Sequence, residues 1–319
     1  AGPINGPIQA AIFGWVPVLL WLLIGGVFFG AVQDFSAMYA SVKNKGRTIG
    51  YIIEKYIGKV GKKLFLAFTW LFSILVVAAF ADVVAKTFNG FDAAGAVVPA
   101  NGSVAMTSVL FIAAAVLLGF IIKYAKLNTW VNTVIAVGLL VLTIVLGLNF
   151  PIYVSLGSWH IMIFVYIAVA SIVPVWALLQ PRDYLNSYLL VAMIVAAVVG
   201  IFAYNPAMNL NAFNGWKVGG NTLFPYLFVT IACGAVSGFH ALVSSGTASK
   251  QIKNEKDMLP VSFGAMLMES MLGVVALVTV GFLATKGNVP TNMTQPQVFA
   301  NAIAIFLTKL SIPEDVSRT

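Results

Sequence analysis

The sequence predicts an all-α fold, a polytopic bundle of transmembrane helices, and three observations support this class. Hydrophobic residues make up 60% of the 319 residues, charged residues make up 9%, and the mean hydropathy is +0.96. Ordinary soluble domains carry about 25% charged residues. Several apolar runs approach or exceed the ~20 residues that cross a ~30 Å hydrocarbon layer. Basic residues gather between these runs, so we expect one membrane domain made of helices.

The first part of the chain contains four expected spans, at residues 10–41, 64–85, 104–122 and 128–148. Residues 1–9 precede them with two Gly-Pro pairs, which we interpret as a broken first helix because proline lacks a donor and glycine loosens the backbone. Gly26 and Gly30 have the spacing that lets a neighbouring helix approach closely. Residues 48–58 are amphipathic, and we expect them to form a helix on the cytoplasmic membrane surface.

The later part contains expected spans at residues 159–179, 184–203, 223–245 and 259–284, and a further helix at 295–310. The stretch 224–250 is unusual because small and polar residues interrupt its apolar character. These residues are Gly234, Gly238, Gly246, Ser237, His240, Ser244, Ser245, Thr247 and Ser249. A helix of this composition indicates that neighbours other than lipid surround it.

The basic residues predict the orientation of the chain. If the connection 42–63 is cytoplasmic, thirteen basic residues lie inside and three lie outside, which fits the positive-inside rule. The inside set is Lys43, Lys45, Arg47, Lys55, Lys59, Lys62, Lys63, Lys123, Lys126, Arg182, Lys250, Lys253 and Lys256, and the outside set is Lys86, Lys217 and Lys286. The net charge of +8 then faces anionic lipids of the cytoplasmic leaflet, and no nucleic-acid partner is expected.

The loops also indicate an internal symmetry. When residues 1–9 are counted as helix one, the long connection 42–63 follows helix two on the inside, and the long connection 204–222 follows helix seven on the outside. Two five-helix halves of opposite orientation, residues 1–153 and 154–319, would produce this pattern, with the second half incomplete at its C-terminal end. Inverted repeats are typical of secondary transporters. A chance coincidence of two long loops is the alternative.

Two helix interruptions are the expected substrate site. A proline frees the carbonyl four residues earlier, and broken helix ends offer N–H groups and a positive dipole to a carboxylate, which suits an anionic or zwitterionic solute. The predicted substrate-binding residues are Gly2, Pro3, Asn5, Gly6, Pro7, Ser171, Pro174 and Trp176. A simple kink is the alternative interpretation of Pro174.

The stretch 224–250 supplies candidates for coupling. Ser237, Ser244 and Ser245 offer oxygens to a cation or hydrogen bonds to a substrate, with helix packing through Gly234 and Gly238 as the alternative.

Ionisable groups within the spans are the other coupling candidates. His240 is a candidate proton relay or a structural histidine. Glu269 lies ten residues into the span 259–284, where a charged carboxylate costs at least ~2.5 kcal/mol, so it is a candidate for the coupling proton or a structural hydrogen bond. Asp34 and Asp82 lie nearer span ends, and Lys86 is expected to pair with Asp82.

Residues 180–183 are expected to turn the chain between helices six and seven. Gln180, Arg182 and Asp183 are therefore predicted gate residues, with Arg182 fixing the gate or the topology or binding a carboxylate. The single cysteine, Cys233, excludes an internal disulfide and a thiol cluster for a metal. No cofactor is predicted.

Five segments carry a resemblance to a known family. They are AGPINGP at the start, GAVQDF at 30–35, VWALLQPRDYLNSYLL at 175–190, FPYLFVTIACGAVSGFHALVSSGTASKQI at 224–252 and GAMLMES at 264–270. Together they resemble the carbon starvation protein A family over most of the chain. Members of that family have a histidine-containing segment before the first Gly-Pro pair and further helices after the point that corresponds to residue 319, so this sequence is expected to be an internal piece. Any metal or cofactor bound by those segments is unassigned.

The resemblance implies an inner-membrane transporter that takes up small peptides, with pyruvate–proton symport in some relatives. It also implies the inverted repeat of the amino acid–polyamine–organocation (LeuT-like) fold. We therefore predict alternating access coupled to protons, with Na⁺ as the alternative ion. A pyruvate or small-carboxylate symporter, and a channel or membrane-embedded nutrient sensor, remain alternatives. No nucleophile motif accompanies the two histidines, so an enzyme is not expected.

Overall fold

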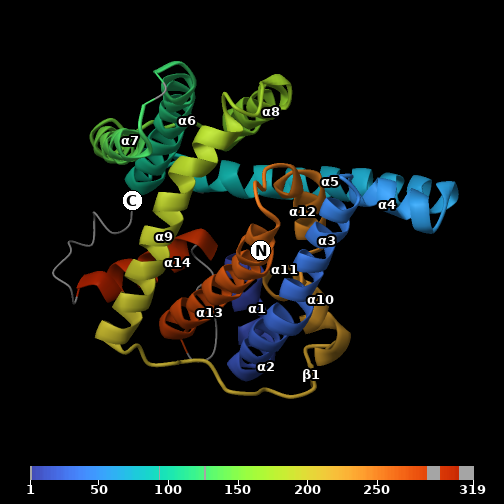
Figure 1. Cartoon of the computed structure of the whole chain (residues 1–319). Helices are drawn as coiled ribbons and strands as arrows, with labels where there is room; N and C mark the ends of the chain where they lie inside the picture. Colours follow the sequence, from blue (N-terminus) through green and yellow to red (C-terminus); the bar gives the residue numbers. More distant parts are fainter. Residues whose placement is uncertain (1, 93, 126, 286–294, 309–319) are drawn as a thin grey trace. The chain divides into compact units, whose positions relative to one another are not determined.

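Long apolar helices dominate the computed structural model, which describes residues 2–92, 94–125, 127–285 and 295–308, except for the side chains of residues 2–7 and 295 (Figure 1). Within these residues, six helical segments are long and apolar enough to cross a membrane, which confirms the all-α membrane class. They are Trp15–Lys43, Lys59–Phe88, Pro99–Ala125, Thr129–Asn149, Leu179–Tyr204 and Glu255–Leu283. The predicted inverted repeat, with halves at residues 1–153 and 154–319, stays a prediction.

Contacts divide the chain into two units. The first unit combines Ala1–Ser73 with Ile201–Phe306, and the second combines Ile74–Gly200 with Leu307–Thr319. The long helix α5 (Lys59–Phe88) passes from the first unit into the second.

The first unit begins with helices α1 (Gly2–Phe13) and α2 (Trp15–Leu20), the π-helix η1 (Trp21–Ala31), α3 (Val32–Lys43) and the surface helix α4 (Ile49–Tyr56). Its later part has a short hairpin, β1 (Lys217–Val218) and β2 (Asn221–Thr222). The helical pieces that follow are η2 (Leu223–Leu227), α10 (Phe228–Thr230), α11 (Ala232–Ala235), α12 (Gly238–Gly246), η3 (Ala248–Lys250), η4 (Glu255–Asp257), η5 (Leu259–Gly264), α13 (Ala265–Leu283) and α14 (Gln295–Thr308).

The prediction of a broken helix at residues 1–9 is wrong, because α1 continues through both Gly-Pro pairs. Pro3 lies in the first turn, where its missing N–H would have no intrahelical partner. Pro7 removes a single backbone bond, which membrane helices tolerate. The interruption lies instead at Gly14, whose φ of 98° favours glycine, and where a Cβ would lie 2.7 Å from the Phe213 Cα.

Backbone groups freed by the Gly14 interruption pair with the loop before β1. The pairs are Trp15 N–H to Asn211 O (3.1 Å), Val16 N–H to Ala212 O (3.1 Å), Asn214 N–H to Phe13 O (3.0 Å), and Asn214 Nδ2 to Ala11 O (3.1 Å) and Ile12 O (2.9 Å). Because unpaired backbone groups are costly away from water, this loop stabilises the interruption.

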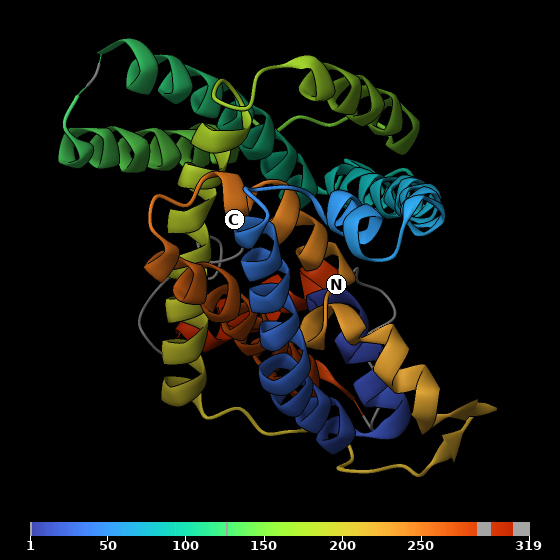
Figure 2. The same ribbon diagram turned by 45° about the vertical axis from the view of Figure 1, so that its right-hand side comes forward.

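The prediction of a continuous span at residues 223–245 is also wrong. Val236 (φ −148°, ψ 93°) and Ser237 (φ −88°, ψ 113°) are extended and separate α11 from α12. Two β-type residues in succession end the intrahelical bonding, so α12 starts anew at Gly238. The break lies beside η1 and α3, which pack against α11 and α12 (Figures 1 and 2).

Glycines allow this close packing, as the spacing of Gly26 and Gly30 predicted. A Cβ added at Gly26 would collide with the Ser270 hydroxyl of α13, and one at Gly30 would collide with the carbonyl of Ala235 in α11. Nothing lies within 4 Å of the position that a Cβ would take at Gly238, so that glycine makes no such approach. The core of this unit is apolar and includes Phe13, Leu22 and Leu227.

The second unit contains the rest of α5, α6 (Pro99–Ala125), α7 (Thr129–Asn149), α8 (Leu156–Ile172) and α9 (Leu179–Tyr204). Helices α6 and α7 pack along each other (Figure 2). The expected span at 159–179 ends early, because Val173 is extended before Pro174. Residues 180–183 do not form the expected turn but lie in the first turns of α9. Pro181 is tolerated there, because a backbone N–H at this position would have no intrahelical partner.

Candidate functional site

Three ionisable side chains from three helices meet inside the first unit. His240 of α12 contacts Asp34 of α3 through Nδ1 (2.9 Å to Oδ2) and Glu269 of α13 through Nε2 (2.7 Å to Oε2). The Asp34 side chain is 3% exposed, whereas His240 and Glu269 are 29% and 24% exposed. We call Asp34, His240 and Glu269 the imidazole–carboxylate cluster.

The helix break places His240 in this cluster. Because Val236 and Ser237 are extended, α12 begins at Gly238 and its first turn carries His240 toward α3 and α13. Gln33, next to Asp34, donates through Nε2 to the carbonyl of Ser237 (3.0 Å), a carbonyl inside the break. The break and the cluster therefore share the same helix–helix contacts.

Small polar groups surround Glu269. The Cys233 thiol lies 4.0 Å from Glu269 Oε1 and 3.7 Å from the Ser237 hydroxyl. Ser270, adjacent to Glu269, donates to the carbonyl of Gly234 (3.3 Å). The Ser270 bond satisfies a carbonyl of the broken segment and holds α13 against α11.

The charges of the cluster do not balance. When both carboxylates are ionised and the imidazole is protonated, the three side chains carry a net charge of −1 inside a membrane protein, where net charge is costly. The Asp34 Oδ1 atom is buried and has no hydrogen-bond partner in the described part of the chain. One added proton would neutralise the cluster, so its composition suits the binding and release of a single proton.

The serines predicted for coupling fall into two settings. Ser237 lies in the break beside Cys233, whereas Ser244 and Ser245 are buried further along α12. The Ser245 carbonyl accepts from the hydroxyls of Ser41 (3.0 Å) and Ser249 (2.9 Å), which are 2.9 Å apart. This network joins the end of α3 to the end of α12.

The predicted substrate residues are divided between the units. Gly2, Pro3, Asn5, Gly6 and Pro7 form the helical start of α1, and their side chains lie outside the described residues. In the second unit, the Ser171 hydroxyl donates to the Ala168 carbonyl of its own helix (2.7 Å), and Pro174 follows the end of α8.

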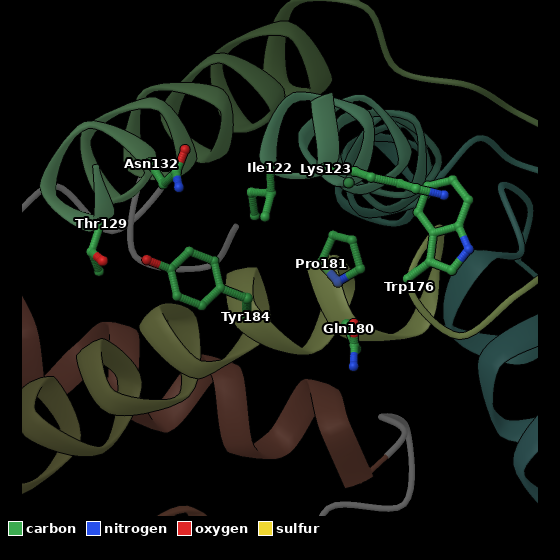
Figure 3. Close-up of a pocket in the computed structure, with 9 residues that line it drawn as sticks. Ile122, Lys123, Thr129, Asn132, Trp176, Gln180, Pro181 and Tyr184 are labelled. Carbon is green, nitrogen blue, oxygen red and sulfur yellow. The ribbon is translucent and has the colours of Figure 1, made fainter. Parts of the chain in front are cut away.

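Trp176 and the predicted gate residue Gln180 line a cavity of about 540 Å³ in the second unit (Figure 3). The other two predicted gate residues, Arg182 and Asp183, form hydrogen bonds. Arg182 donates to the Tyr166 hydroxyl (3.3 Å) and to Asp183 Oδ1 (3.3 Å).

Sequence reasoning missed Asp34, which it placed near a span end without a role. The available signal was its position four residues after Gly30, at a point where close packing was already predicted.

The expected pair of Asp82 with Lys86 is confirmed at 2.7 Å, and His160 also contacts Asp82 (3.2 Å). Among the described residues, no group of three or more His, Cys, Asp or Glu side chains could hold a metal ion.

The fold and the site define a class, that of multi-pass helical membrane proteins with a partly buried imidazole–carboxylate cluster at a broken helix. Within that class, the family profile of "Carbon starvation protein CstA" matches residues 1–316. The chain therefore belongs to the CstA family, which confirms the resemblance carried by its motifs, and the six apolar helices of the described residues make it a multi-pass membrane protein.

Curated relatives agree with this assignment. The chain is 35% identical over 314 residues to "Peptide transporter CstA" of Bacillus subtilis, covering 94% of this chain and 50% of that protein. It is 36% identical over 296 residues to "Peptide transporter CstA" of Escherichia coli, covering 88% and 40%. It is 35% identical over 314 residues to "Pyruvate/proton symporter BtsT" of Escherichia coli, covering 89% and 40%. The chain thus spans half or less of these relatives, and no solved structure matches it.

Proposed function

We propose that this chain forms part of a proton-coupled secondary transporter that takes up small peptides by alternating access. The observation that carries the proposal is the imidazole–carboxylate cluster, in which both nitrogens of His240 contact carboxylates at a helix break. Broken helices are typical of transporter binding sites. The relatives named peptide transporters support the substrate class.

The geometry suits proton transfer through the imidazole. Glu269 is the more exposed carboxylate and Asp34 is the enclosed one, with His240 between them. The protonated imidazole can pass its Nδ1 proton to Asp34 or its Nε2 proton to Glu269, because both pairs are within hydrogen-bond distance, and one proton taken up from outside then makes the three side chains neutral. The cluster is neutral with the added proton and carries −1 without it. Movement between inward- and outward-facing states is therefore easier in the neutral form.

Pyruvate is the second candidate substrate. The relative named pyruvate/proton symporter is as similar to this chain as the peptide transporters are. Counterflow in proteoliposomes with labelled dialanine and labelled pyruvate, under a proton or a sodium gradient, distinguishes the two substrates and the two ions. We expect exchange of the dipeptide and accumulation under the proton gradient.

Substitution of Glu269 by glutamine tests the coupling proposal. Glu269→Gln keeps the side-chain shape but removes the titratable group that faces His240 Nε2, so we expect pH-gradient-driven uptake to be abolished while the yield of folded protein is retained. The matched control is Glu255→Gln, in the exposed helix η4. Undiminished uptake by Glu269→Gln would remove Glu269 from the mechanism.

A further inference from the structure

The cavity in the second unit is the starting point for an inference that is independent of the transport proposal. Its volume is about 540 Å³, and it lies between α6, α7 and the start of α9 (Figure 3). Its lining includes Ile122, Lys123, Asn132, Trp176, Pro181 and Tyr184. Cavities of several hundred cubic ångströms are the usual size of small-molecule sites.

The floor of the cavity is firmly packed. A Cβ added at Gly119 would lie 2.7 Å from Pro181 Cγ, so α6 and α9 touch directly at this point. On the other side, the Tyr184 hydroxyl is 2.9 Å from the Thr133 hydroxyl of α7. Leu118 and Leu185 are fully buried beneath these contacts. The cavity is therefore formed by fixed helix contacts rather than by loops alone.

One positive charge borders the cavity. The Lys123 ammonium lies 3.2 Å from the centre of the Trp176 ring, and Figure 3 shows the lysine side chain running toward that ring. Phe120 packs edge-on against the same ring (5.8 Å). Within the described residues, no carboxylate lies within ion-pair distance of Lys123. The indole fixes the ammonium without neutralising its charge, so the ammonium can attract an anion.

The surroundings of the cavity resemble a membrane–water interface. Tyr124 and Trp130 flank the α6–α7 turn and are 69% and 77% exposed, and Phe120 is 45% exposed. Tryptophan, tyrosine and lysine are enriched at the level of the lipid headgroups. The distribution of basic residues predicts that this turn is on the cytoplasmic side, where anionic lipids occur.

We propose that this cavity binds the headgroup of one anionic phospholipid. The phosphate contacts the Lys123 ammonium, and the adjoining apolar part of the lipid lies against Ile122, Pro181 and the exposed aromatic rings. A soluble phosphate or carboxylate has the same charge. The lipid fits better, because most of the wall is carbon and the exposed rings beside it suit an acyl chain.

Native mass spectrometry of the complete chain in detergent tests this site by titration with phosphatidylglycerol and with phosphatidylcholine. For Lys123→Gln we expect about fivefold weaker binding of the tightest phosphatidylglycerol, the scale for one basic residue at an anionic surface, and unchanged phosphatidylcholine binding. Trp176→Leu removes the ring that fixes the ammonium and should also weaken the binding of phosphatidylglycerol. The matched control, Lys59→Gln, alters an exposed lysine outside the cavity.

Three outcomes would overturn the proposal. Equal phosphatidylglycerol affinity of Lys123→Gln and Lys59→Gln would show that the cavity does not hold the lipid. Equal loss for both lipids would show that charge is not recognised. Displacement of phosphatidylglycerol by millimolar inorganic phosphate or dialanine would show that the site takes a soluble anion. Size-exclusion profiles of the variants establish that each is folded.

Discussion

Asp34 is the most enclosed member of the imidazole–carboxylate cluster, and its two oxygens have different roles. Oδ2 contacts His240, while Oδ1 is buried without a partner in the described part of the chain. An isolated carboxylate in such a place would be costly, so the imidazole beside it stabilises the fold, in addition to its proposed role in proton transfer. Glu269, on the opposite side of the ring, is more accessible and is the expected entry point of the proton.

Substitution of Asp34 by asparagine separates exchange from coupling. Asp34→Asn keeps a polar group against His240 but makes the cluster neutral without an added proton. We therefore expect counterflow exchange of dialanine to persist and accumulation under a pH gradient to be lost, as measured in proteoliposomes. Asp257→Asn, at an exposed position in η4, serves as the control. Wild-type accumulation by Asp34→Asn would contradict the proposed role.

At the scale of the element, the broken segment α10–α12 is held by its neighbours. Its sequence alone has no helix-stopping proline at residues 236 and 237, and the extended backbone there is fixed by contacts with η1, α3 and α13. Gln33 satisfies the Ser237 carbonyl, and Ser270 satisfies the Gly234 carbonyl. The interruption at Gly14 is stabilised in the same way by the loop that contains Asn214.

The close approach at Gly30 predicts that an alanine at this position destabilises the protein. A Cβ there would collide with the Ala235 carbonyl and lie 3.1 Å from Met266 Cε. Overpacking of this kind costs about 1–3 kcal/mol, so we expect Gly30→Ala to lower the melting temperature in detergent and reduce uptake. Gly138→Ala in α7 is the control, because nothing lies within 4 Å of its added methyl group. Equal melting temperatures for the two variants would argue against the contact.

At the scale of the whole molecule, six long apolar segments among the described residues make the chain a multi-pass membrane protein. The ends of these segments and the connections between them carry the basic residues that predict orientation. The family match extends over residues 1–316, so it includes residues of both units. Lys286, one of the three basic residues predicted outside, lies outside the described residues.

The predicted orientation can be measured with single cysteines, because Cys233 is the only native one. In a Cys233→Ser background, Lys253→Cys should react with a membrane-impermeant maleimide only from the cytoplasmic side. Lys217→Cys, in β1, should react only from the outer side. Both side chains are exposed, so burial does not mask the result. Labelling of both from the same side would overturn the topology.

The sequence alone determined the class, the family and most of the spans. A membrane crossing depends on the length and apolarity of one continuous segment, so it can be predicted from the residues of that segment. The segments expected at 64–85, 104–122, 128–148, 184–203 and 259–284 match α5, α6, α7, α9 and η5 with α13, and α4 and α14 also lie where they were expected. His240 and Glu269 were recognisable as unusual residues within apolar segments.

Only the tertiary structure decided where the helices break and which acids contact His240. The Gly-Pro pairs indicated a break that the fold does not make, whereas Gly14 and residues 236–237 interrupt their helices because neighbouring segments supply the missing backbone partners. Asp34 and His240 are 206 positions apart, and no local pattern joins them. Their contact exists because the glycines of η1 allow α11 and α13 to approach, which places α3 beside the first turn of α12.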